Sequence, residues 1–333
     1  MTVTPDLASG KTTAAFWVAG PGRGEIRTET LPEPSGSEAV VRTLYSGISR
    51  GTETLVYTGH VPASEYDRMR APFQAGDFPG PVKYGYANVG TVLYGPDDLE
   101  GRDVFCLYPH QREYVVPAEA LYRLPPGVPP QRAILAANLE TALNAVWDAG
   151  IRPGQHVAVV GAGSIGCLVA WMAARIDECS VELIDVNANR AALARALGLR
   201  FAAPSAAAHG AQVVLHASGT AEGLATALGL CAYEATVIEL SWYGDRPVPI
   251  ALGGAFHSQR LTIKSSQVGG VAPSHRKEWS RRRRLEYALA LLTAPALDAL
   301  INSEDRFEAL PGTLARLAHG HDDRTVMHRV RYS

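Results

Sequence analysis

Two hydrophobic patterns divide the chain near residue 135. Before it, short runs of alternating apolar and polar residues, such as 38–45 and 89–94, are separated by clusters of glycine and proline. Alternation with a period of two predicts strands with one buried face, and the frequent turns favour an irregular barrel. At roughly 150 residues per domain, a chain of 333 residues is expected to form two domains.

Beyond residue 135, helical patterns alternate with short apolar runs. Strand, helix and strand repeated in this order are typical of an α/β domain with a parallel sheet. The expected strands are 155–160, 181–185, 212–216, 236–240, 261–266 and 324–332, and the expected helices are 133–149, 164–175, 188–197, 221–230, 280–292 and 311–318.

A glycine-rich run, Gly161-Ala162-Gly163-Ser164-Ile165-Gly166, joins the first of these strands to the following helix. Gly161 allows a tight turn, Gly163 lets a pyrophosphate approach the backbone, and Gly166 lets the helix pack closely on the strand. The helix N-terminus offers free N–H groups and a positive dipole end to the phosphates. The run therefore predicts a dinucleotide site that includes Ser164 and Ile165.

The second strand of this half is followed by an acidic residue, Asp185, nineteen positions after Gly166. A carboxylate there can accept hydrogen bonds from the adenosine ribose, and it repels a 2′-phosphate. The sequence therefore predicts NAD in preference to NADP. Arg190 is a further candidate cofactor residue that weakens this preference, because an arginine can bind a 2′-phosphate.

Composition excludes several other classes of protein. The net charge of −2 gives no indication of a nucleic-acid or membrane partner. The four cysteines have neither metal-ligand nor redox spacing, which is typical of reduced thiols. No apolar stretch approaches the roughly 20 residues of a membrane span, and residues 1–13 carry no apolar signal segment. We therefore expect a cytoplasmic protein.

The order of the two halves resembles that of the medium-chain dehydrogenase/reductase superfamily, whose members are alcohol dehydrogenase-like. The stretch Ser46–Glu53 is similar to the branch of bacteriochlorophyllide dehydrogenase-like and zinc-type alcohol dehydrogenase-like proteins. The stretches that carry the resemblance are Tyr45–Glu53, Pro81–Gly90, Val104–Gln111 and Asn138–Ala142.

This resemblance implies a fold class and a domain division. The fold would be α/β, with a GroES-like β-barrel substrate domain and a Rossmann domain built on a doubly wound parallel sheet. The substrate domain would contain residues 1–137 and 271–333, and the Rossmann domain residues 138–270. Relatives commonly dimerise through the edge of the Rossmann sheet, so a homodimer through residues 249–266 is expected.

The chain departs from the superfamily at the positions that hold zinc. The resemblance aligns Ser49 with the first cysteine ligand, Tyr86-Ala87 with a His-Glu pair, and about Ala137 with the last cysteine. None of these residues supplies a thiolate or an imidazole. The lobe that holds structural zinc is also absent, because Gln111 runs directly into Arg112. We therefore expect an enzyme without zinc or any other metal.

Four cofactor contacts are implied by the resemblance. Arg50 would lie on the pyrophosphate, and Thr141 would pack on the nicotinamide ring. Ser218 and Ser241 would line the nicotinamide ribose. A solvated surface arginine and an ordinary helix residue are the alternatives for Arg50 and Thr141.

Without a metal, hydride transfer to a carbonyl needs hydrogen-bond donors and a general acid. The catalytic candidates are Tyr86 and Glu140 first, His110 third, and Ser49. Each has a structural alternative. Tyr86 can fill the vacated metal space, His110 can be a satisfied turn histidine, and Ser49 can bond the backbone. Glu140 can interact favourably with a helix N-terminus.

Three further residues, Thr52, Tyr108 and Trp242, are candidates for substrate binding. The run Arg281–Arg284 predicts a solvated helix face. Its alternative is a patch that attracts an acidic substrate or partner.

The sequence thus favours an NAD(H)-dependent, zinc-independent oxidoreductase that interconverts an alcohol and a carbonyl on a small or medium-sized substrate. Two alternatives stay open. One is an NADPH-dependent enoyl or quinone reductase that acts on an activated C=C bond. The other is a non-catalytic protein that only binds a dinucleotide.

Overall fold

The computed structural model describes residues 10–320 and 322–333, which form two compact units. The first unit contains the chain up to Ala137 together with 289–293 and 301–333, and the second contains Asn138–Ala288 and Ala294–Leu300. Residues 1–9, on which the expected lack of a signal segment partly rests, lie outside the described residues. In the described part of the chain, no helix is both long enough and apolar enough to cross a membrane.

The first unit is built mainly from antiparallel strands. One sheet has the order β2-β1-β5-β4, and a seven-stranded sheet has the order β16-β17-β3-β6-β7-β9, with β8 also paired to β3. Its elements are β1 (Thr12–Gly20), β2 (Arg23–Thr30), β3 (Glu38–Ile48), α1 (Arg50–Thr58), β4 (Ala75–Gly76), β5 (Val82–Lys83), β6 (Asn88–Tyr94), β7 (Asp103–Cys106), β8 (Glu113–Pro117), β9 (Tyr122–Arg123), α2 (Pro130–Ala133), β16 (Ile301–Arg306), α8 (Leu310–Ala318) and β17 (Met327–Arg331).

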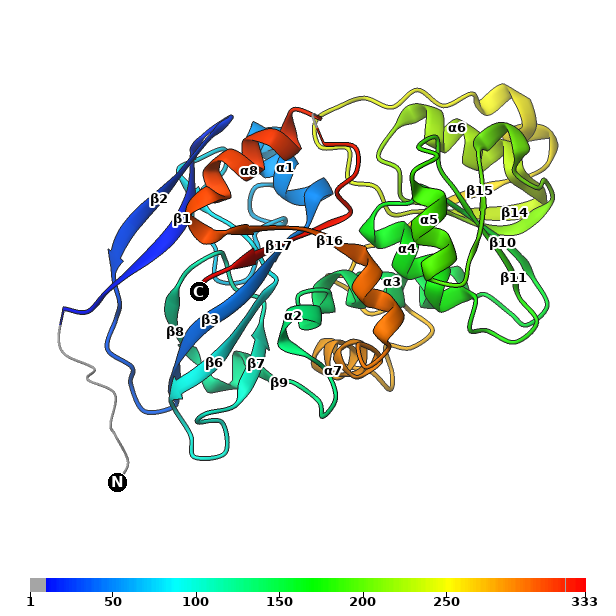
Figure 1. The fold of residues 1–333 in the computed structure, drawn as a ribbon. Coiled ribbons are helices and arrows are strands. Elements are labelled where there is room, and N and C mark those ends of the chain that lie inside the picture. The colour runs from blue at the N-terminus through cyan, green and yellow to red at the C-terminus, as the bar shows by residue number, and fades with distance from the viewer. Residues whose placement is uncertain (1–9, 321) are drawn as a thin grey trace. The chain divides into compact units, whose positions relative to one another are not determined.

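The closing strand β17 lies antiparallel to β3, so the end of the chain completes a sheet that begins near its start (Figure 1). The expected strands 38–45 and 89–94 correspond to β3 and β6. Strand β16 was not predicted, because its residues alternate only between half-buried and exposed positions and show no apolar face. The core beside β3 contains Val41, Val92 and Tyr114.

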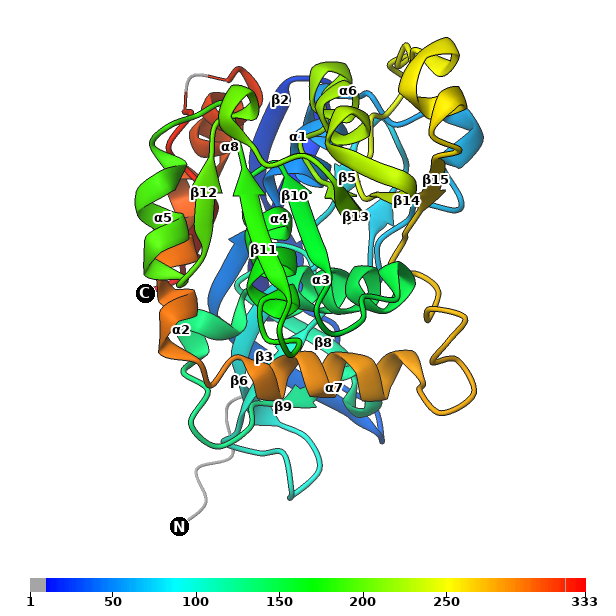
Figure 2. The same ribbon diagram turned by 90° about the vertical axis from the view of Figure 1, so that its right-hand side faces the viewer.

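The second unit is built on a six-stranded parallel sheet of order β12-β11-β10-β13-β14-β15 (Figure 2). After β10 the chain adds β11 and β12 on one side, and it then returns to add β13, β14 and β15 on the other side of β10. The order in which strands are added therefore reverses between β10 and β13. All or most residues of the following elements belong to this unit: α3 (Ala136–Ala149), β10 (His156–Val160), α4 (Ser164–Ala173), β11 (Ser180–Ile184), α5 (Arg190–Ala196), β12 (Arg200–Ala202), β13 (Ala211–His216), α6 (Ala221–Leu230), β14 (Cys231–Glu239), β15 (Thr262–Ser265) and α7 (Arg281–Leu291).

This strand order confirms the predicted fold class, a doubly wound parallel sheet beside a unit of antiparallel sheets. Helices α4 and α6 pack on the central strands β10 and β13, and α5 packs on β12. In such sheets, ligands bind beyond the carboxyl ends of the strands where the winding reverses. The carboxyl ends of β10 and β13 are therefore the place to look for a site.

By their contacts, residues 271–288 and 294–300 group with the second unit, so the expected division, with 271–333 in the first domain, stays a prediction. A buried arginine on α7 ties part of this segment to the second unit. Arg284 is 1% exposed and donates from Nε to Glu140 Oε1 at 3.0 Å and from Nη1 to Asn144 Oδ1 at 2.5 Å. Both partners lie on α3. The run Arg281–Arg284 is therefore not a uniformly solvated face, since its last member is buried.

The contact with Arg284 also gives Glu140 a structural partner. Burial raises the pKa of Glu140, although the charge and hydrogen bond of Arg284 act in the opposite direction. A buried pair of this kind adds little net stability, but removal of one partner leaves an uncompensated buried charge.

We therefore expect Arg284→Leu to lower the free energy of unfolding by about 3–5 kcal/mol at pH 8. Without the guanidinium, the pKa of Glu140 rises further above its value in the unfolded chain. Stability is then retained at low pH and lost as the pH rises through the folded-state pKa, so the deficit shrinks toward pH 5. Denaturant unfolding at both pH values measures this.

Two variants serve as controls for Arg284→Leu. Arg282→Leu removes an exposed arginine that pairs with Glu286, one turn along α7, and should cost less than about 1 kcal/mol. Glu140→Gln combined with Arg284→Leu should recover most of the loss. Equal effects of Arg282→Leu and Arg284→Leu, or a deficit independent of pH, would contradict the role given to the pair.

Candidate functional site

The glycine-rich run forms a tight turn between β10 and α4. Gly161 has a φ of 105°, and a Cβ there would lie 2.6 Å from the backbone nitrogen of Ser218. A Cβ on Gly166 would lie 1.8 Å from the carbonyl oxygen of Gly161, so only glycine permits this approach of helix and strand. Gly163 is the N-cap of α4, and its hypothetical Cβ meets no atom within 4 Å.

The first turn of α4 contains the other two residues of the run, Ser164 and Ile165. Ser164 accepts a hydrogen bond from Asn138 Nδ2 at 2.9 Å. The arrangement leaves open space in front of Gly163 at a helix N-terminus, which is the geometry that an anionic phosphate group needs.

Asp185 follows β11 beside this turn. Its carboxylate accepts hydrogen bonds from the backbone N–H of Ala162 at 2.6 Å and of Asn187 at 2.8 Å. The next residue, Val186, is 86% exposed and offers an apolar surface beside the carboxylate. Arg190, by contrast, is only 8% exposed, so its guanidinium is largely withdrawn from solvent.

The remaining candidates of the second unit lie on α3 and after β13 and β14. Ser218 adjoins Gly161, as described above. Ser241 accepts a hydrogen bond from the N–H of Gly219 at 3.0 Å, which links the two segments that follow these strands. Trp242 comes directly after Ser241, and Thr141 lies on α3; both are half-buried.

In the first unit, three hydroxyl-bearing residues meet, and we refer to Ser49, Thr52 and Tyr86 as the hydroxyl cluster. Ser49 is the N-cap of α1, Thr52 lies in its first turn, and Tyr86 precedes β6. Burial and the nearby Glu53 carboxylate raise the pKa of Tyr86 to about 12, while hydrogen bonds with Ser49 and Thr52 oppose the shift. The phenol is therefore protonated at neutral pH and can donate a hydrogen bond.

Behind the hydroxyl cluster lies a buried chain of polar side chains, Ser46, Glu53, His110 and Tyr332, which we call the Glu53 network. Glu53 accepts a hydrogen bond from the N–H of Ser49 at 2.7 Å, and its other oxygen lies 2.8 Å from His110 Nε2. His110 Nδ1 lies 2.7 Å from Ser46 Oγ, which lies 3.0 Å from the hydroxyl of Tyr332.

The Glu53 network supplies the hydrogen-bond partners that allow His110 to be buried. His110 is 1% exposed, and both ring nitrogens have partners within the network. Gly85, with a φ of 135°, lies against the imidazole, because a Cβ there would be 3.0 Å from His110 Cδ2. The geometry thus favours a positioning role for His110, and it leaves the half-buried Tyr86 as the better placed proton donor.

Sequence reasoning missed Ser46, Glu53 and Tyr332. Ser46 and Tyr332 are 286 positions apart, so no local pattern could join them. Glu53 did carry a signal, because it is a charged residue one position after Thr52 in a short helix that is buried on that side.

A group of aromatic rings packs against Tyr86, a member of the hydroxyl cluster. The ring of Tyr84 packs edge-on against Tyr86 at 6.0 Å and tilted against Phe78 at 5.7 Å, and Phe78 contacts Tyr66 at 5.7 Å. Tyr108, a predicted substrate-binding residue, is 8% exposed and stacks on Tyr114 at 3.8 Å. Tyr108 is therefore mostly committed to the core.

Arg50, the first residue of α1, directs Nη1 to the carbonyl oxygen of Thr325 at 3.4 Å. This contact lies within the first unit. The structure thus brings together Ser49, Thr52, Tyr86 and His110 in one unit, and the glycine run, Asp185 and Ser218 in the other. Glu140, in the second unit, is paired with Arg284.

The residues at the three zinc-ligand positions do not fit a zinc ion. Tyr86 holds its proton up to a pKa of about 12 and is hydrogen-bonded to Ser49, while Ala137 has no donor atom. Zinc sites use cysteine, histidine or carboxylate ligands. Within residues 10–320 and 322–333, no group of three such side chains is placed to hold a metal ion.

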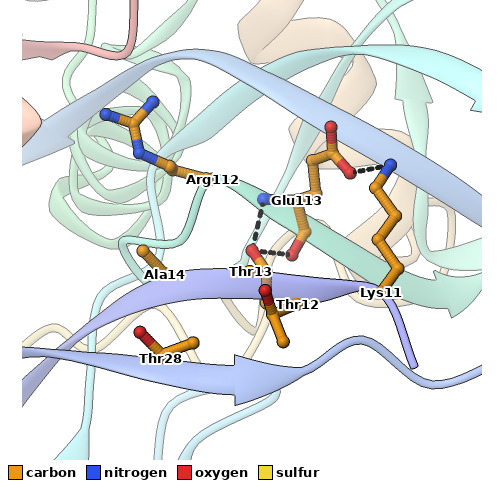
Figure 3. Close-up of a pocket in the computed structure, with 7 residues that line it drawn as sticks. All are labelled: Lys11, Thr12, Thr13, Ala14, Thr28, Arg112 and Glu113. Carbon is orange, nitrogen blue, oxygen red and sulfur yellow. Dashed lines mark hydrogen bonds and ion pairs between the residues drawn. The ribbon is translucent and has the colours of Figure 1, made fainter.

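A hollow lies in the first unit (Figure 3). Its charged groups are paired, since Glu113 lies 2.5 Å from Lys11 and Arg112 pairs with Glu308. None of the residues predicted for the site lines it, and it carries no evident chemistry. The lining residues are Lys11, Thr12, Thr13, Ala14, Thr28, Arg112 and Glu113.

Comparison with known proteins identifies relatives of a large part of the chain. No family model matches it. D-guloside 3-dehydrogenase of Escherichia coli K12 is 26% identical over 299 residues, which cover 81% of this chain and 84% of that protein. The 2-desacetyl-2-hydroxyethyl bacteriochlorophyllide A dehydrogenase of Cereibacter sphaeroides is 30% identical over 181 residues, covering 47% of this chain and 52% of that protein.

The solved structures show the same fold. A ‘putative zinc-binding dehydrogenase’ from Sinorhizobium meliloti 1021, bound to NADP, aligns with a TM-score of 0.76 over 96% of this chain and 99% of that chain, at 20% identity. The sequence relatives are therefore dehydrogenases by name, and the fold is one that dehydrogenases share.

Two glycine variants should separate folding from dinucleotide binding. Gly166→Ala places a methyl group against the Gly161 carbonyl, so we expect a loss of about 1–3 kcal/mol or more in unfolding free energy. The methyl group of Gly163→Ala contacts no other atom, so the unfolding midpoint should stay nearly unchanged. The same methyl group occupies space that the pyrophosphate needs, so the affinity for the dinucleotide should fall. Thermal unfolding and fluorescence titration with NADH measure the two effects. Equal stability of both variants, or unchanged NADH affinity in Gly163→Ala, would contradict the geometry.

Proposed function

Because the chain's sequence relatives and fold are those of the zinc-type alcohol dehydrogenase-like medium-chain dehydrogenases, we propose that it is an NAD(H)-dependent oxidoreductase that interconverts an alcohol or sugar hydroxyl and a carbonyl without zinc. The observation that carries the proposal is the hydroxyl cluster with its buried Glu53 network, which stands where the resemblance places metal ligands.

The preference for NAD is supported by the charge beside the glycine turn. Asp185 places a carboxylate at the turn, where it would repel a 2′-phosphate and accept hydrogen bonds from ribose hydroxyls. Arg190, the nearest candidate for a 2′-phosphate, is buried. The exposed Val186 offers an apolar surface on which an adenine ring can lie.

The proposed chemistry assigns proton handling to the first unit. Bound NADH supplies the hydride. As a carbonyl becomes an alkoxide, the charge on its oxygen needs a hydrogen-bond donor and then a proton. The Tyr86 phenol is protonated, and its pKa of about 12 is close enough to that of an alcohol for it to give up its proton.

The Glu53 network supports this donor in two ways. The Glu53 carboxylate accepts a hydrogen bond from the backbone N–H of Ser49, and this positions the residue whose hydroxyl bonds Tyr86. Its negative charge also raises the pKa of Tyr86 and keeps the phenol in the donor form. In this proposal Glu53 and His110 are positioning residues, Ser49 and Thr52 orient the phenol, and Tyr86 is the catalytic acid.

The names of the relatives support a ring-shaped substrate, whereas Tyr84 and Phe78 beside Tyr86 are 6% and 5% exposed and belong, like Tyr108, to the core. A sugar ring presents C–H groups on one face and hydroxyls at its edge, and both of the named relatives act on ring-containing molecules, a guloside and a bacteriochlorophyllide. We therefore propose a sugar or similar cyclic alcohol as the substrate class.

A homodimer through the edge strand β15 also stays a proposal, supported by the nearby exposed side chains of Ile250 and Leu252.

Titration with NADH and NADPH, followed by a panel of sugars, cyclic ketones and enones, tests the proposal. We expect tighter binding of NADH and turnover of alcohols or ketones. Turnover confined to enones with NADPH would instead support the C=C reductase. Binding without turnover of any member would support a non-catalytic dinucleotide-binding protein.

Tyr86→Phe should lower kcat by roughly 10²–10³-fold, because a single donor to a developing oxyanion has about that effect. The KM for NADH should stay unchanged. Tyr84→Phe is the matched control, since its ring contacts Tyr86 but lies outside the hydroxyl cluster, and it should retain turnover. Steady-state kinetics on an active substrate measure both. Near wild-type turnover in Tyr86→Phe, together with a large loss in Glu140→Gln, would move the catalytic role to Glu140.

A further inference from the structure

A second group of ionisable side chains lies in the second unit, at the carboxyl ends of β13 and β14. His216 and Glu239 are the last residues of these strands and lie opposite each other in the parallel register. His216 Nδ1 is 2.8 Å from one carboxylate oxygen of Glu239 and 3.0 Å from the other. His216 Nε2 is 2.6 Å from the hydroxyl oxygen of Ser218.

The pair is buried and its carboxylate is held from several sides. His216 is fully buried, and the side chain of Glu239 is 13% exposed. Glu239 also accepts hydrogen bonds from the N–H of Ser241 at 2.8 Å and from the hydroxyl of Tyr243 at 3.0 Å. Burial alone would raise the pKa of Glu239, but the interactions with His216 and Ser241 outweigh it and leave that pKa lowered.

These contacts fix the tautomer of the imidazole. An ionised carboxylate can only accept hydrogen bonds, so His216 carries a proton on Nδ1. A neutral ring then has Nε2 free to accept the proton of Ser218. The hydroxyl oxygen of Ser218 has two lone pairs, and one of them accepts the N–H of Thr220 at 3.3 Å, with Thr220 Oγ1 a further 3.1 Å neighbour. One lone pair is thereby left for a further donor, and the residue is half-exposed.

The surrounding backbone is shaped around this hydrogen bond. Gly223, in the first turn of α6, has no room for a side chain, because a Cβ there would lie 1.9 Å from Ser218 Oγ and 2.7 Å from His216 Nε2. Ser218 also adjoins Gly161, the first glycine of the dinucleotide turn. The arrangement is therefore a built site at the point where the winding of the sheet reverses.

A serine, a histidine and a glutamate in this order also occur in hydrolases, but hydrolases need free N–H groups to hold an oxyanion. Here the N–H of Ala217 donates to Val160 O, that of Gly219 to Ser241 Oγ, and that of Thr220 to Ser218 Oγ. These nearby donors are already engaged. A binding role fits the geometry better than a nucleophilic one.

We infer that the His216–Glu239 pair is a positioning device that holds Ser218 as a hydrogen-bond acceptor for a hydroxyl or amide donor of the bound nicotinamide nucleotide. The inference rests on the proposed function for the cofactor itself, and it adds two residues, His216 and Glu239, that would act through Ser218 without touching the cofactor.

The test is a fluorescence titration with NADH at pH 8 on the full chain. The variants are His216→Asn, which keeps a donor toward Glu239 but loses the acceptor for Ser218, then Ser218→Ala and the double variant. Each single variant should weaken NADH binding about 2- to 12-fold, as expected for one hydrogen bond. The double variant should be no weaker than either single one, because both remove the same interaction.

Two further measurements separate positioning from a general structural role. The KM for NADH should rise by the same factor as its dissociation constant, with kcat changed less than about twofold. His209→Asn is the matched control, an exposed histidine of the same unit that contacts only the carbonyl of Gly229 in the described structure, and it should bind NADH normally. If His216→Asn does not fold, Glu239→Gln takes its place beside Ser218→Ala, with the same expected results for the single and double variants.

Three outcomes overturn the inference. If all variants bind NADH equally well, the inference is overturned, and the proposed function is unaffected. If the losses of NADH affinity in the two single variants multiply in the double variant, His216 does not act through Ser218. Failure of the unsubstituted chain to bind NADH or NADPH overturns the proposed function and the inference together.

Discussion

The carboxylate of Glu53 is the group on which the first unit's site depends. A buried charge is costly unless it is fully hydrogen-bonded, and Glu53, at 4% exposure, meets this demand with the N–H of Ser49 on one oxygen and His110 on the other. Satisfying the carboxylate fixes the start of α1, the ring of His110 and, through Ser49, the phenol of Tyr86. Burial, and after it the same charge, raises the pKa of that phenol to about 12. One buried carboxylate thus sets the geometry of the proposed donor and contributes to its raised pKa.

The second unit follows the same rule at a different place. Its sheet delivers His216 and Glu239 to the ends of neighbouring strands, and close backbone contacts at Gly161, Gly166 and Gly223 leave room only for hydrogen atoms. The turn that can receive phosphates and the pair that orients Ser218 are therefore consequences of strand order and of a few glycines. Buried ionisable groups occur at both sites with partners that account for their charge, as is usual where function requires a defined protonation state.

Local patterns in the sequence predicted the fold well and the site in part. The strands and helices of the Rossmann half, the glycine run and Asp185 all depend on residues close together in the chain, and the predicted fold class is confirmed. The Glu53 network could not be predicted in this way, since Glu53 and His110 are 57 positions apart and Ser46 and Tyr332 are 286 apart. The partner of Glu140 was hidden for the same reason, because Arg284 lies 144 positions away and its neighbours in the run are exposed. The assignment of Glu140 to catalysis stays a prediction, now set against a structural partner.

If the proposed function is right, hydroxyl and carboxylate side chains take the place of the zinc that the family resemblance implies. The most direct test is metal analysis of the protein purified without added metal, combined with NADH-dependent turnover measured before and after treatment with a strong chelator. The account predicts zinc far below one ion per chain and turnover that the chelator leaves unchanged. About one zinc ion per chain, with turnover that is lost on its removal and restored by its return, would contradict it.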